Sequence, residues 1–212
     1  LQDHPDFLEQ RPDVLENLRF NHQSGSAVSL IERQVEQLRA TNAEMEKRLA
    51  SLLRVAAEKS GWGREMEEGR GLGIAFHFAH RGHVAHVAEV TVDGDRYTLD
   101  KVYAAVDVGP ILNMSGALGQ VEGCVIDALS TTQLETTIAG GAVQQVNFDQ
   151  YPILRIDKAP DVECHFIQSD NSPTGLGEPP FEPVAPAVAN AIFAASGTRI
   201  RELPFTRAGI TL

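Results

Sequence analysis

A heptad repeat of apolar residues constrains the N-terminal part of the chain more tightly than any other feature of the sequence. Two heptad positions are apolar over about four repeats, and they hold Val28, Val35, Asn42, Leu49 and Ala56, and Ile31, Leu38, Met45 and Leu52. This pattern favours a coiled coil over an ordinary surface helix. The hydrogen-bonding groups of the Asn42 side-chain amide are satisfied best by the Asn42 amide of a second chain in a parallel dimer. The repeat therefore predicts a homodimer. The alternative is one helix that packs on its own domain, with Asn42 at the rim.

The composition argues against several classes of protein. The 212 residues carry a formal net charge of −11, which opposes nonspecific nucleic-acid binding because such binding needs Lys and Arg to neutralise phosphates. No apolar run approaches ~20 residues, so no membrane-spanning helix is expected. Cys124 and Cys164 form no CxxC unit, so we expect neither a disulfide framework nor a zinc site, and a cytoplasmic location. The chain begins at Leu1 without a basic-then-apolar leader, which we interpret as a fragment that is not secreted.

The pattern changes from helix to strand near Trp62. Glycines at 61 and 63 predict the end of the long helix. Beyond them the sequence predicts strands at 71–78, 84–92, 97–108, 142–146, 152–155 and 162–168, and helices at 113–133 and from Pro186 to Gly197. Strands and helices do not alternate regularly, which favours an α+β fold: an N-terminal helical and coiled-coil segment followed by a mixed strand-and-helix domain. We expect residues 1–57 to hold short helices and the coiled coil, and residues 58–212 to hold the second domain.

The loop at 171–186, NSPTGLGEPPFEPVAP, is the first candidate for chemistry. Gly175 and Gly177 allow the backbone to approach a cofactor closely, and Glu178 precedes a proline that restricts its backbone. A carboxylate presented rigidly against apolar neighbours can act as a general base. The alternative is a plain proline-rich turn with a solvated glutamate, and spacing alone favours that turn by about three to one.

Four histidines at a spacing of three residues form the second candidate: His77, His80, His83 and His86. Neutral imidazole binds zinc, copper or nickel, but strand alternation places these side chains on two different faces. Two ligands on one face are too few for a structural zinc site. We therefore expect these histidines to pack on the surface or in a hairpin, and we predict no metal ligands among them.

Six phrases in one order carry a resemblance to a known family. They are GRGLGIAFHF, HVAHVAEVTVDGD, YAAVDVG, GQVEGCVIDALS, NFDQYPILR and GLGEPPFEPVAPAVANAIFAASGTRIRELP. From about Leu53 to Pro204 the chain resembles the C-terminal part of the molybdopterin-binding large subunit of isoquinoline 1-oxidoreductase and related aldehyde dehydrogenases, in the xanthine dehydrogenase superfamily. The resemblance implies hydroxylation of N-heterocycles or aldehydes with water as oxygen source. It also implies molybdopterin as cofactor and an iron–sulfur small subunit as partner.

The same resemblance implies roles for single residues. Glu178 corresponds to the active-site base of the GxGEP loop, to which Gly175 and Gly177 also belong. Gln120 of the QxEG motif corresponds to a residue close to the molybdenum centre. Gly123 would keep its helix near the pterin.

The sequence also departs from the pattern of this family. Met114 follows Asn113 where family members often carry proline, so the start of the next helix is expected to be looser. Glu122 shares the QxEG motif and is expected to be structural. The family's large subunit is several times longer than the matching piece. We therefore expect the isolated chain to lack a complete active site.

The N-terminal part resembles a different family. HPDFLEQRPDVLENL and SGSAVSLIERQVEQLRATNAEMEKRL, within about residues 1–55, look like the N-terminal region of the bacterial domain-of-unknown-function 484 family. In that family a coiled coil precedes a GAF-like domain, which has no counterpart here. We therefore predict a chimera with its junction near residues 50–58. Two functions follow: a molybdenum hydroxylase fragment on a dimerising coiled coil, or a catalytically silent homodimeric interaction protein.

Overall fold

The computed structural model describes residues 30–151 and 153–212. The chain divides into two compact units, Leu1–Glu46 and Lys47–Leu212. Helix α2 (Leu30–Ser60) ends where the sequence predicts, because Gly61 takes a φ of 64° that favours glycine. The short helices expected before the coiled coil, and Val28 of the heptad repeat, lie outside the described residues.

The heptad positions of α2 have two different environments. In the first unit the side chains of Ile31, Leu38 and Met45 are exposed, with Leu38 at 63%. In the second unit Leu52 and Ala56 are fully buried against the strands of their own chain. Packing on its own domain is therefore correct for the C-terminal end of the helix. The coiled coil and the homodimer remain predictions for the N-terminal end.

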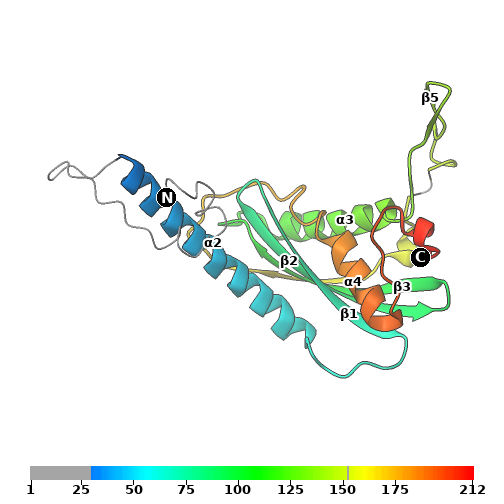
Figure 1. Cartoon of the computed structure of the whole chain (residues 1–212), viewed down its shortest axis with the longest axis horizontal. Helices are drawn as coiled ribbons and strands as arrows, with labels where there is room; N and C mark the ends of the chain where they lie inside the picture. Colours follow the sequence, from blue (N-terminus) through cyan, green and yellow to red (C-terminus); the bar gives the residue numbers. More distant parts are fainter. Residues whose placement is uncertain (1–29, 152) are drawn as a thin grey trace, which may run out of the picture. The chain divides into compact units, whose positions relative to one another are not determined.

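The second unit is built on a four-stranded sheet with the order β1-β2-β3-β6 (Figure 1). Three strands form an antiparallel meander and the last strand pairs in parallel with the third: β1 (Arg70–Ala79), β2 (Gly82–Asp93), β3 (Arg96–Asp107) and β6 (Asp161–Phe166). His80 and Arg81 have positive φ in the β1–β2 turn, and Gly94 has positive φ in the β2–β3 turn. The α+β class is confirmed.

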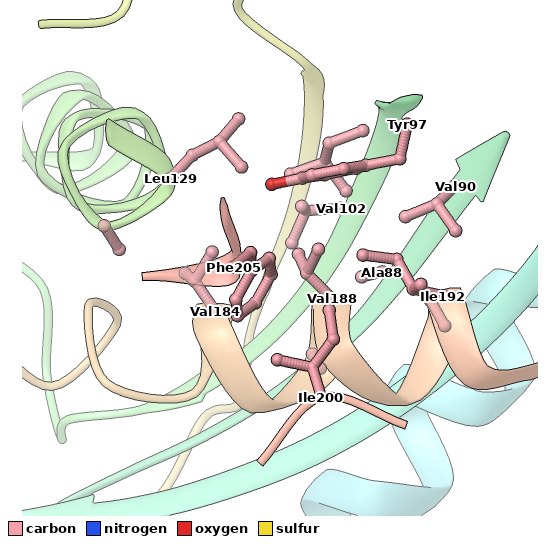
Figure 2. Packing of buried hydrophobic residues seen from close by; sticks show 14 of the residues in the cluster. Ala88, Val90, Tyr97, Val102, Leu129, Val184, Val188, Ile192, Ile200 and Phe205 are labelled. Carbon is pink, nitrogen blue, oxygen red and sulfur yellow. The ribbon is translucent and has the colours of Figure 1, made fainter. Parts of the chain in front are cut away.

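Strand alternation gives this sheet two different faces. One face packs on the end of α2 through Leu72, Val87 and Ala105. The opposite face packs on α3 (Met114–Thr131) and α4 (Val184–Ser196). Figure 2 shows the core on this second face, where Val188 and Ile192 of α4 meet Ala88 and Val90 of β2.

Helix α4 crosses β1 at two glycines. A Cβ added at Gly71 would lie 2.7 Å from the backbone nitrogen of Ala195. At Gly73 it would collide with the backbone of Ala187 and Ala191. Close approach of the helix to the strand therefore requires glycine at both positions.

Three local predictions from the sequence were wrong. Residues 153–155 form no strand and lead into the short 3-10 helix η1 (Ile156–Lys158). The strand expected at 142–146 is only β5 (Ala142–Val143), paired with β4 (Ile138–Ala139). Helix α4 begins before Pro186, at Val184. Phe193 of α4 is 39% exposed, and the guanidinium of Arg199 lies over its ring at 3.3 Å.

Among the described residues, no helix is both long and apolar enough to span a membrane.

Candidate active site

The loop that carries Glu178 is attached to the end of β3. Strands β3 and β6 are parallel, so their carboxyl ends meet at one edge of the sheet. There Asp107, which is 3% exposed, accepts hydrogen bonds from Ser169 Oγ at 2.5 Å and from Asn171 Nδ2 at 2.9 Å. The backbone nitrogen of Thr174 donates to the carbonyl of Val108 at 3.1 Å. These bonds fix the entry to the loop.

The tip of the β1–β2 hairpin holds the middle of the same loop. The hydroxyl of Thr174 donates to the backbone carbonyl of His80. The ring Nε2 of His80 lies 3.0 Å from Oε2 of Glu178. The chain therefore attaches its candidate base to a histidine that is 98 residues away in the sequence.

Helix α3 contacts the loop from the other side. Cys124 Sγ donates to the carbonyl oxygen of Gly177 at 3.0 Å. A Cβ added at Gly177 would lie 3.5 Å from Nε2 of Gln120. Burial, followed by the charges of Glu182, Asp127 and Glu178, raises the pKa of the Cys124 thiol to about 11, so the thiol stays protonated and can donate. The structure thus brings Gln120 close to Gly177, the residue before Glu178.

The other residues predicted for the site lie around this group without contacting it. Gly123 and Gly175 are exposed, and a Cβ added at either would meet nothing within 4 Å. Glu122 lies on the side of Cys164, where its charge adds to the effect of burial and raises the pKa of that thiol to about 12. The two glycines therefore border open space, and the charge of Glu122 acts on Cys164.

A groove of about 470 Å³ lies beside the loop, between the end of β3 and the start of α3. Gln120, Thr174 and Leu176 line one part of it. Asn113 lines another part and caps α3 by accepting a hydrogen bond from the backbone of Gly116 at 3.0 Å. This cap gives α3 a defined start although Met114 stands where proline was expected.

The four histidines divide among three environments. His77 Nε2 lies 3.9 Å from a carboxylate oxygen of Glu182, and His80 contacts the loop. His83 and His86 are buried, burial lowers the pKa of both rings, and none of their ring nitrogens has a hydrogen-bond partner among the described residues. Within residues 30–151 and 153–212, no group of three or more His, Cys, Asp or Glu could hold a metal ion.

Four residues hold the loop in place in a role that was not predicted from the sequence: Asp107, Thr174, His80 and Cys124. Signals existed for two of them. Cys124 lies one helical turn after Gln120, which places both on one face of α3. Asp107 ends a run of buried strand residues, and a carboxylate there needs hydrogen-bond donors. No feature of the sequence indicated the contact between His80 and Glu178, because the regular spacing of the four histidines bears only on metal binding.

The sheet, its two covering helices and the GxGEP loop make this part of the chain similar to the C-terminal part of a molybdenum hydroxylase large subunit. This resemblance is confirmed by curated relatives. Isoquinoline 1-oxidoreductase subunit beta of Brevundimonas diminuta is 33% identical over 161 residues, covering 73% of this chain and 21% of the relative. Membrane-bound aldehyde dehydrogenase [pyrroloquinoline-quinone] of Gluconacetobacter polyoxogenes is 34% identical over 171 residues. The match covers 77% of this chain and 22% of the relative. The chain thus spans about a fifth of the length of these two relatives.

Solved structures agree on the fold. The crystal structure of quinoline 2-oxidoreductase from Pseudomonas putida 86 matches with a TM-score of 0.54 at 20% identity. The match covers 58% of this chain and 17% of that chain.

The N-terminal resemblance is confirmed as well. The family model "Protein of unknown function, DUF484" matches residues 1–67. It extends beyond the expected end near residue 55 and includes the end of α2 at Ser60.

Proposed function

We propose that residues 58–212 are part of the molybdopterin-binding domain of an oxidoreductase that hydroxylates N-heterocycles or aldehydes with water as oxygen source. The position of Gln120 beside Gly177, the residue before Glu178, carries this proposal. The names of the relatives support the class of reaction, and two further relatives are named as molybdenum-binding subunits of xanthine dehydrogenase.

The residues present fit one side of such a cofactor. Open space borders Gly123 and Gly175, so a flat ring system meets no side chain there. The exposed amide of Gln120 can donate a hydrogen bond into the groove.

Bound molybdenum cofactor would supply the redox step by accepting two electrons from the substrate. The chain's own contribution is the base and its surroundings. Oε2 of Glu178 is held by His80, while Oε1 accepts no hydrogen bond from the residues that the structure describes. Oε1 is therefore the atom that takes the proton. Gln120 orients the reacting groups through its amide.

Electron removal and assembly involve further partners in this proposal. An iron–sulfur small subunit would carry the electrons away. The coiled coil at the N-terminal end of α2 would join two copies of the chain. Neither free cysteine is paired in a disulfide, which supports a reducing cytoplasm.

The chain is also proposed to be a chimera of two families. The match to residues 1–67 ends within the helix-to-strand transition that begins the oxidoreductase resemblance. Sequencing of the parent gene tests this point. A single unbroken homologue spanning residues 30–90 would contradict a junction near residues 50–58.

A second function, a catalytically silent homodimeric interaction protein, is favoured by one observation. The heptad residues Val35, Leu38 and Met45 are exposed in the first unit, as expected for a helix surface that packs on a second helix.

Metal analysis combined with turnover separates the two functions. The chain, purified together with the polypeptides that complete its active site, is assayed for molybdenum, for pyrroloquinoline quinone and for dye reduction with isoquinoline or benzaldehyde. The proposal expects stoichiometric molybdenum and a loss of turnover of at least about 100-fold in Glu178→Gln. Glu122→Gln is the matched control, and it should retain turnover. Metal-free, inactive protein with the mass of a dimer would contradict the proposal and support the second function.

A further inference from the structure

We propose that His80 is a positioning residue for Glu178, which fixes one carboxylate oxygen so that the other remains available for proton transfer. The inference rests on the proposed function for the role of Glu178 as a base. It goes beyond that function because nothing in the resemblance assigns a role to His80.

The backbone of the hairpin tip aims His80 at the loop. His80 has a φ of 52°, in the left-handed region that residues other than glycine seldom occupy. The hydroxyl of Thr174 donates to the carbonyl of this same residue, which ties the tip to the loop four residues before Glu178. Pro179 also lies against the tip, because its Cγ would be 3.5 Å from a Cβ added at Gly82. The hairpin therefore contacts the loop on both sides of Gly175–Gly177.

The ring contact then selects one oxygen of the carboxylate. Nε2 of His80 lies 3.0 Å from Oε2, within the range of a charge-assisted hydrogen bond. Cys124 holds the backbone carbonyl of Gly177, so the ring contact adds a constraint on the side chain of Glu178 that the backbone contacts do not supply. Pro179 restricts the backbone of Glu178, and His80 restricts its side chain.

The contact is too exposed to serve mainly as a stabilising ion pair. The side chains of His80 and Glu178 are 64% and 72% exposed. Exposed pairs of this kind contribute little to the free energy of unfolding. Loss of the ring should therefore change the order of the loop without changing the stability of the fold, and this difference separates positioning from a structural role.

Backbone dynamics test the proposal without any cofactor. In the full chain, the NMR order parameters of Gly177 and Glu178 should fall from about 0.85 to below about 0.6 in His80→Ala. His80→Gln should restore them, because the glutamine Nε2 can donate to the same carboxylate oxygen. His165→Ala is the matched control: its ring pairs with Glu163 at 2.9 Å on β6, and its loss should leave the loop unchanged.

A reciprocal measurement reads the histidine. The ring of His80 should hold its proton on Nε2 in the wild type and exchange between tautomers in Glu178→Ala, as seen in long-range nitrogen–proton spectra. Unchanged order parameters in His80→Ala, or an unchanged ring signal in Glu178→Ala, would overturn the proposal. In cofactor-loaded chain, kcat should fall in His80→Ala and recover in His80→Gln, with KM constant. Absence of molybdenum together with the expected loop dynamics would contradict the proposed function and leave the contact with His80 standing.

Discussion

Asp107 and Asn171 are joined by a hydrogen bond of 2.9 Å across 64 residues of sequence. Asp107 ends β3, and Asn171 begins the loop that leads to Glu178. This bond and the one from Ser169 give the buried carboxylate donors for both of its oxygens. The position of the candidate base therefore depends on a residue that makes no contact with it.

Replacement of Asp107 by alanine should destabilise the fold. The change leaves Ser169 and Asn171 without their acceptor, so the free energy of unfolding should fall by about 2–4 kcal/mol. Urea denaturation followed by the fluorescence of Trp62 measures it. Asp170→Ala is the control, because that side chain is exposed one residue before Asn171. Equal stability of the two variants would show that the buried hydrogen bonds contribute nothing.

A pair of glycine substitutions tests the crossing of α4 over β1. Gly73→Ala should lower the free energy of unfolding by about 1–3 kcal/mol or more, because the new Cβ collides with the backbone of Ala187 and Ala191. Gly119→Ala in α3 should instead raise it by about 0.5–1 kcal/mol, because its Cβ meets nothing within 4 Å and alanine favours a helix. Thermal denaturation of both variants gives the sign. A neutral Gly73→Ala would mean that the helix shifts away from the strand without cost.

Two leucines of the heptad repeat should respond differently to the same change. Leu52 is fully buried, so Leu52→Ala should cost about 2–5 kcal/mol in the free energy of unfolding. Leu38→Ala, at an exposed position, should leave that energy nearly unchanged and weaken self-association. Urea denaturation measures the first effect and sedimentation equilibrium the second. A chain that stays monomeric at all concentrations would rule out the coiled-coil dimer.

Stability should fall on acidification because of His86. Burial lowers the pKa of its ring to about 3, whereas the unfolded chain has a value near ~6.5. The sign follows from linkage: below pH ~6.5 the unfolded state binds a proton that the folded state excludes, so stability is complete above that pH and is lost below it.

The expected slope for this one group is about 1.4 kcal/mol per pH unit between about pH 6 and pH 4. Urea denaturation at several pH values measures the slope, and His86→Leu should reduce it. A smaller slope in the same direction should remain, because burial also lowers the pKa of His83. An unchanged slope in His86→Leu would contradict the assignment.

The candidate site could be predicted only in part. Gly177, Glu178 and Gln120 were found through motifs, and the structure brings Gln120 close to Gly177, the residue before Glu178. The contact between His80 and Glu178 could not be found, because it joins a hairpin tip to a loop that are distant in the sequence. Local periodicity carries no information about which loop a hairpin tip meets.

The sequence by itself determined the long helix, the meander strands, β6 and the two covering helices in their order, because the period of the apolar residues distinguishes helix from strand within a few residues. It determined the end of α2 at Gly61 and the three strands of the meander for the same reason. The tertiary structure decided which partner each apolar face received. Leu52 packs on the sheet while Leu38 stays exposed, although both occupy the same heptad position. It also decided the parallel pairing of β3 with β6, which places Asp107 beside the loop of Glu178. Such pairings are set by the burial of apolar area across the whole unit, and that area exists only once the chain has folded.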